Sequence, residues 1–149
     1  MDTLTKRFGM HAFKRREKPM GFNKLTRNHY PGILCGIVIL ILTGLPGSVF
    51  PQVKPVIGLD KVVHALMYAG FAFACIWGYR KPYQEGDDAY RRKALLITCI
   101  VSIVYGGLTE LMQEFLIPSR TGSWYDFFAD AIGTWLGISI FQYFFRKGK

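Results

Sequence analysis

The stretch PGILCGIVILILTGL, residues 31–45, decides the fold class of this protein. It contains no charged side chain, and the charge-free segment continues to Val53. A helix of about 20 apolar residues spans the roughly 30 Å of hydrocarbon in a membrane. A core helix of a soluble bundle usually keeps a polar stripe, whereas this segment offers only Thr43, Ser48 and Gln52. The stretch therefore predicts a transmembrane helix.

The composition of the whole chain agrees with a membrane class. Of the 149 residues, 50% are hydrophobic and 15% aromatic, and the mean hydropathy is +0.18. This is more apolar than a soluble domain of this size needs. We predict an all-α polytopic membrane protein with four transmembrane helices. The predicted spans are Pro31–Val53, Val62–Tyr79, Ala94–Ile117 and Tyr125–Phe145.

The positions of the basic residues predict how the chain is oriented. Positive residues stay on the cytoplasmic side of a membrane. Most Lys and Arg residues lie before the first predicted span, between the second and third, or after the fourth. We expect a basic cytoplasmic arm over residues 1–30, a membrane domain over 31–145, a solvated cytoplasmic loop over 80–93 and a cytoplasmic tail over 146–149. Both termini are then cytoplasmic, and the two short connections face outward.

The net charge of +9 points to a membrane surface as the partner, and not to nucleic acid. The sequence holds no nucleic-acid-reading motif, and the basic residues cluster at the ends of the predicted spans. In the N-terminal arm, Leu4, Phe8 and Ala12 are spaced among the charges, as in a helix lying on an anionic leaflet. The lipid bilayer is therefore the predicted partner.

Ionisable residues inside the predicted spans converge near the outer surface. Glu110 lies about 24 Å along the third span, counted from the cytoplasmic side. His64 lies one turn inside the second span, and Asp130 one turn inside the fourth; both spans start outside. Charged residues in a span are costly unless they are paired or face a wet cavity. The predicted outward-facing polar cleft comprises Asp60, Lys61, His64, Glu110, Gln113, Arg120, Asp126 and Asp130.

Several chemistries fit such a cleft. As a binding site, Arg120 and Lys61 would pair with phosphate, and the other polar groups would bond sugar or amide groups. As an enzyme, the catalytic candidates are His64, Glu110 and Asp126, which would supply general acid and base. A purely structural salt-bridge network is the plain alternative. A transporter or proton relay is disfavoured, because the inner halves of the spans are almost purely apolar.

Cofactors and self-association are not predicted. A metal site would use His64 and the acids, but neither HExxH nor a cysteine-based site is present, so we expect no metal and no other cofactor. Gly133 and Gly137, in GTWLG, lie on the same face as Asp126 and Asp130. This small-xxx-small pattern favours close helix packing within the chain over a homo-oligomer.

Three blocks of the sequence resemble the signature of the VanZ-like family of bacterial membrane proteins. The blocks are DKVVH…Y from Asp60, YGGLTELMQ from Tyr105, and R…SWYDFFADAIGTWLG from Arg120. They fall within residues 31–145, in this order. One departure is Asp130, where the family commonly has asparagine. The pattern carries over onto Asp60, Lys61, His64, Glu110, Gln113, Arg120, Asp126, Asp130, Gly133 and Gly137.

The resemblance implies a location in the bacterial cytoplasmic membrane and a role at the cell envelope. The family's named member is associated with low-level resistance to the glycopeptide teicoplanin. We therefore expect this protein to bind or modify an envelope lipid, a surface component or a glycopeptide-related ligand. The alternative is a membrane-embedded hydrolase or transferase that acts on a lipid-linked substrate.

Overall fold

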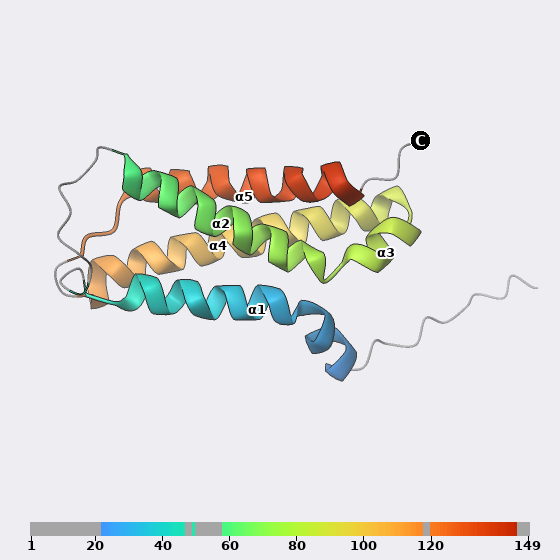
Figure 1. Cartoon of the computed structure of the whole chain (residues 1–149), viewed down its shortest axis with the longest axis horizontal. Coiled ribbons are helices and arrows are strands. Elements are labelled where there is room, and N and C mark those ends of the chain that lie inside the picture. Colours follow the sequence, from blue (N-terminus) through green and yellow to red (C-terminus); the bar gives the residue numbers. More distant parts are fainter. Residues whose placement is uncertain (1–21, 47–48, 50–57, 118–119, 146–149) are drawn as a thin grey trace, which may run out of the picture.

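The computed structural model describes residues 22–46, 49, 58–117 and 120–145, with side chains from residue 28 onward. Within these ranges every element is helical, which confirms the all-α prediction there. Figure 1 shows the long helices running side by side along the molecule, with the short helix α3 near the end at which α5 finishes. The helices are α1 Phe22–Gly44, α2 Leu59–Trp77, α3 Arg80–Glu85, α4 Asp88–Leu116 and α5 Trp124–Phe145.

Two of the described helices, α2 and α4, are long and apolar enough to cross a membrane. Helix α1 contributes a shorter apolar stretch, Asn28–Gly44. Helix α5 carries Asp126, Asp130 and Gln142 among its apolar residues and does not reach the same hydropathy. Two of the four predicted spans are thus supported by length and composition, and the number of crossings and their direction stay predictions.

The exterior of α4 is more apolar than its buried face. Large side chains such as Leu96, Ile100 and Leu108 are more than half exposed. In water, an apolar surface of this extent would favour association or aggregation, whereas lipid tails solvate it. The pattern therefore fits a membrane environment. The residues that α4 buries are small or polar, namely Ala94, Thr98, Ser102, Gly106, Thr109, Glu110 and Gln113.

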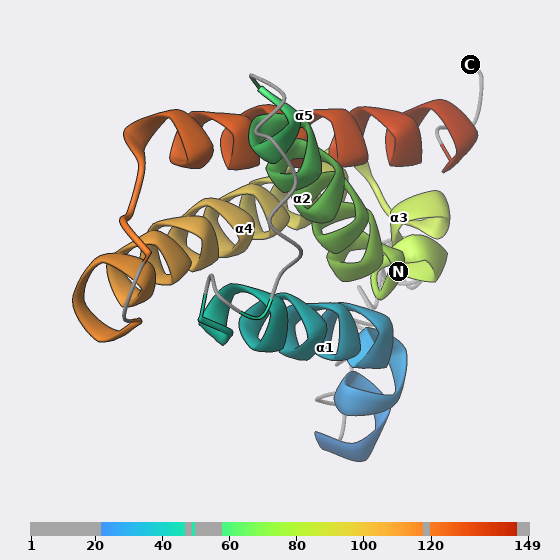
Figure 2. The same ribbon diagram turned by 60° about the vertical axis from the view of Figure 1, so that its left-hand side comes forward.

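The first predicted span has different boundaries in the structure. Helix α1 begins at Phe22, well before Pro31, and ends at Gly44. Figure 2 shows that this helix is bent in its first part; it contains Pro31, whose ring removes a backbone donor and favours a bend. Pro46 follows the end of the helix and cannot continue it easily. Residues 1–21, 47–48, 50–57, 118–119 and 146–149 lie outside the described residues. Residues 22–30 of the predicted N-terminal arm belong to α1.

The prediction of a loop over residues 80–93 is wrong, whereas the cytoplasmic location of this segment stays a prediction. The segment holds α3 and the beginning of α4, separated at Gly86. Helix α4 begins earlier than expected because Asp87 caps it: its carboxylate accepts a hydrogen bond from the backbone N–H of Tyr90 at 2.8 Å. Such a cap satisfies one of the donors that the first helical turn leaves unpaired.

Helices α2 and α5 pack against each other through small residues. A Cβ atom added at Gly133 would overlap the backbone of Ala65, and one added at Gly137 would overlap that of Ala69. Both contacts involve carbonyl oxygens of α2, so the two backbones touch. This close contact fixes the relative position of the first turns of α2 and α5, where His64 and Asp130 lie.

The two ends of the bundle differ in chemistry. We call the aromatic end the part where α2 and α5 finish beside α3. There Ile76, Tyr83, Ala94 and Phe141 form a buried cluster, and the ring of Phe141 lies 5.2 Å from that of Tyr83. We call the opposite end, where α2 and α5 begin and α4 finishes, the loop end (Figure 1).

Candidate functional site

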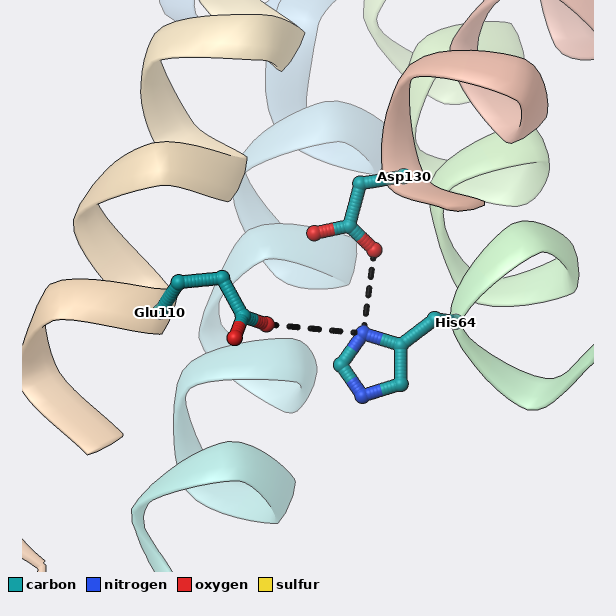
Figure 3. A group of neighbouring side chains, drawn as sticks. All are labelled: His64, Glu110 and Asp130. Atoms are coloured by element: carbon teal, nitrogen blue, oxygen red, sulfur yellow. Dashed lines mark hydrogen bonds and ion pairs between the residues drawn. The ribbon is translucent and has the colours of Figure 1, made fainter. Parts of the chain in front are cut away.

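One ionisable side chain from each of three helices meets at the loop end. His64 comes from α2, Glu110 from α4 and Asp130 from α5 (Figure 3). His64 Nδ1 lies 3.0 Å from Asp130 Oδ1 and 3.7 Å from Glu110 Oε1. We call these three residues the polar cluster. The structure thus brings together three of the predicted site residues from distant parts of the sequence.

Helix register explains why these side chains meet. His64 lies about one turn after the start of α2, Asp130 lies in the second turn of α5, and Glu110 lies about two turns before the end of α4. Helices α2 and α5 begin at the end of the bundle where α4 finishes (Figure 1). Their positions along the helices therefore bring all three residues to a similar height in the bundle. The backbone contact of Gly133 with Ala65 keeps the helices carrying Asp130 and His64 close together.

The segment between α4 and α5 holds the second oxygen of Glu110. The backbone N–H of Ser123 donates to Glu110 Oε2 at 2.8 Å, and that of Gly122 donates to Glu114 Oε2 at the same distance. A Cβ at Gly122 would press on the carbonyl oxygen of Glu110, so the absence of a side chain lets the segment approach α4. The bond from Ser123 holds Glu110 Oε2 and leaves Oε1 directed at His64 (Figure 3).

A more exposed group of charges lies next to the polar cluster. Lys61 Nζ lies 2.7 Å from Asp60 Oδ2 and 3.4 Å from Asp126 Oδ1. The side chains of Lys61 and Asp60 are 42% and 57% exposed, whereas that of Asp126 is 15% exposed. Exposed ion pairs contribute little to stability, so these residues are better placed to meet a ligand than to hold the fold.

One predicted site residue, Gln113, contacts a helix that contributes nothing to the polar cluster. Gln113 was expected at the outer interface but is buried, and its Nε2 donates to the carbonyl of Thr43 at 3.3 Å. It joins α4 to α1. Arg120 is half-buried, and its backbone N–H donates to the carbonyl of Ile117 at 3.3 Å. Its role beside the carboxylates stays a prediction.

Sequence reasoning did not single out the hydroxyl pair beneath the polar cluster. Tyr68 is fully buried, and its Oη lies 2.8 Å from Thr109 Oγ1. Thr109 also donates to the carbonyl of Gly106. One signal was present: Tyr68 lies four residues after His64, and residues at that spacing share a helix face. The partner could not be found from sequence, because Thr109 lies on another helix.

Several buried oxygens at this site have no hydrogen-bond partner. They include Glu110 Oε1, Asp126 Oδ1 and Asp130 Oδ2. Glu110 is 7% exposed and Asp130 is 1% exposed. An unsatisfied buried acceptor costs about 1–3 kcal/mol, and more when it is charged. Glu110 Oε1 and Asp126 Oδ1 keep only longer ion pairs, with His64 at 3.7 Å and with Lys61 at 3.4 Å. A bound partner that adds hydrogen bonds or charge would therefore relieve part of this cost.

A separate apolar groove lies between α1, α2 and α4. Its volume is about 420 Å³, and its lining includes Ile33, Ile37, Phe71, Val101 and Tyr105. Ile33 and Ile37 are half exposed, so the groove opens on the apolar exterior. The polar cluster does not line it. The predicted polar site and this groove are therefore different features.

Comparison with known proteins found no relative of this chain. No protein-family model, curated protein or solved structure matches the chain.

Proposed function

We propose that this chain is a VanZ-like integral membrane protein whose polar cluster takes part in binding or modifying a cell-envelope lipid or surface component. In this proposal four spans cross the bacterial cytoplasmic membrane, both termini are cytoplasmic, and the loop end faces outward. The resemblance of the three sequence blocks and the distribution of basic residues support this orientation.

One observation carries the proposal. A bundle with an apolar exterior gathers His64, Glu110 and Asp130 from three helices and leaves buried carboxylate oxygens without hydrogen-bond partners. Ionisable groups at membrane depth are expensive and mark functional sites by default. The site lies beside an exposed charge group, Lys61 and Asp60, through which the polar headgroup of a lipid would approach.

A catalytic role is the second candidate, and the orientation of His64 favours it. Asp130 lies at hydrogen-bond distance from Nδ1. Figure 3 shows Nε2 on the side of the ring that faces away from both carboxylates. A carboxylate that orients one imidazole nitrogen while the other faces substrate is the arrangement of a general acid or base. Such a site would serve a hydrolase or transferase acting on a lipid-linked substrate.

Complementation of a deletion strain tests the proposed function. The strain receives wild type, Glu110→Gln or the control Glu114→Gln, and equal amounts of protein in the membrane are verified. We expect wild type and Glu114→Gln to restore teicoplanin resistance to the level of the parent strain, and Glu110→Gln to leave the strain as susceptible as the deletion. If deletion leaves teicoplanin and vancomycin susceptibility unchanged, the resistance role is wrong for this chain.

Lipid analysis separates binding from catalysis. Wild type and Glu110→Gln are purified in mild detergent, and their retained lipids are identified by mass spectrometry. An unaltered envelope lipid retained by wild type alone supports binding. Accumulation of a lipid with Glu110→Gln, and of its cleaved product with wild type, supports catalysis. Identical lipid profiles would contradict both.

A further inference from the structure

The polar cluster has the donor atoms of a metal site. One donor atom each from His64, Glu110 and Asp130 can be chosen so that all three lie within 4.8 Å of one another. Two of the separations, from His64 Nδ1 to Asp130 Oδ1 and to Glu110 Oε1, are 3.0 and 3.7 Å. Ligands about 2.1 Å from a tetrahedral cation lie about 3.4 Å apart. The observed separations are close to that spacing.

A second observation points to a ligand between these groups. Glu110 is more than nine-tenths buried, and its Oε1 is directed at His64 yet has no hydrogen-bond partner. Asp130 is almost fully buried and also has an oxygen without a partner. Buried carboxylates in proteins are paired or coordinate metals. One imidazolium can neutralise only one of these two carboxylates, whereas a divalent cation neutralises both.

The surroundings hold the donors in place. The N–H of Ser123 binds Glu110 Oε2, which turns Oε1 toward the other two donors. Hydrogen bonds of this kind to a ligating carboxylate orient it for the metal. Sequence analysis considered His64 and the acids as metal ligands but did not favour such a site, because the three donors come from three helices and form no local motif such as HExxH.

We propose that His64, Glu110 and Asp130 bind a divalent first-row transition-metal cation. A mixed set of imidazole and carboxylate donors suits Zn²⁺ and similar ions. Three protein ligands leave a coordination position open, and in the proposed function an oxygen of the lipid headgroup occupies it. Only that last step rests on the proposed function; cation binding itself does not.

Direct metal binding tests the proposal. The full chain, carrying a tag without histidine, is purified in detergent, stripped with EDTA and titrated with Zn²⁺ by calorimetry. Co²⁺ is then added as a spectroscopic probe. We expect about one Zn²⁺ per chain and visible Co²⁺ absorption bands. Glu110→Gln and Asp130→Asn should weaken Zn²⁺ binding at least about 100-fold, and Glu114→Gln should bind like wild type.

Measurements on the wild-type protein alone can contradict the proposal, so the test does not depend on whether the variants fold. Absence of Zn²⁺ binding to folded wild type, shown by an unchanged melting temperature with EDTA or Zn²⁺, contradicts it. Equal binding by wild type, Glu110→Gln and Asp130→Asn contradicts it as well, because the ion then binds elsewhere.

Lipid analysis keeps the two proposals apart. Zn²⁺ binding without any retained envelope lipid supports the metal site and counts against the proposed function. Lipid retained equally by EDTA-treated wild type that binds no Zn²⁺ supports the proposed function and rejects the metal site.

Discussion

At the aromatic end of the bundle, Phe141 is fully buried and packs against the rings of Tyr83, Phe73 and Phe145. At the loop end, Glu110 and Asp130 are almost as deeply buried, but each keeps an oxygen without a partner. The first end gains stability from close packing. The second accepts a cost in stability, as functional sites often do. Substitutions at the aromatic end should therefore mainly lower stability, and substitutions at the loop end should mainly impair function.

The largest effect on stability is expected from Phe141→Ala. It removes a buried ring from the aromatic end, and such substitutions cost about 3–5 kcal/mol in soluble proteins. In lipid we expect about 3 kcal/mol, because packing is lost while the ring still avoids water. Thermal unfolding in detergent measures this. Tyr143→Ala, on the same helix but 83% exposed, is the control and should change stability little; equal losses would contradict the packing argument.

Gly133→Ala should destabilise the protein by about 2 kcal/mol, as overpacking commonly does. Its Cβ would overlap the backbone of Ala65, and no flexible side chain can give way. Gly70→Ala is the matched control, because no atom lies within 4 Å of its Cβ, and alanine is the better helix former. Comparison of the two melting temperatures tests whether backbone contact between α2 and α5 positions the loop end. A similar response to both substitutions would argue against that contact.

Glu110→Gln should abolish function while leaving the fold intact. The amide keeps the shape of the side chain and can still accept from the N–H of Ser123, and it removes a buried charge. We therefore expect the metal-free protein to be unchanged or about 1 kcal/mol more stable, with loss of lipid and Zn²⁺ binding. The melting temperature in EDTA gives the stability. A loss as large as that of Phe141→Ala would show that the cluster is structural.

Lys61→Gln should have the smallest effect on stability, because the ion pairs of Lys61 with Asp60 and Asp126 are partly exposed and such pairs contribute little. The difference from wild type should shrink further at high salt. Unfolding at low and high salt, with Lys81→Gln at the exposed start of α3 as control, measures it. A larger loss of stability that does not depend on salt would show that Lys61 stabilises the loop end.

Helix content was largely predictable because long apolar runs with few charges leave few alternatives. The predicted segments Val62–Tyr79, Ala94–Ile117 and Tyr125–Phe145 overlap α2, α4 and α5. Boundaries were less predictable. Helix α4 begins at Asp88 because Asp87 caps it. This local hydrogen bond outweighs the polar composition that suggested a loop.

The residues of the candidate site could be predicted from the sequence, but the contacts between them could not. Depth along each helix placed His64, Glu110 and Asp130 near one surface. The same reasoning misplaced Gln113, which turns inward to the carbonyl of Thr43. The depth of a residue along its helix follows from the rise per residue. The direction in which its side chain points depends on how the helix is rotated in the bundle.

The helical class, the apolar character and the few ionisable residues within the apolar segments could all be recognised from the sequence. These properties follow from local chemistry, since apolar runs and helix periodicity are visible residue by residue. The position of His64 between Asp130 and Glu110, and the bond from Ser123 to the second oxygen of Glu110, became visible only in the folded bundle. These contacts depend on close approach of α2 and α5 through glycine, a long-range effect of packing.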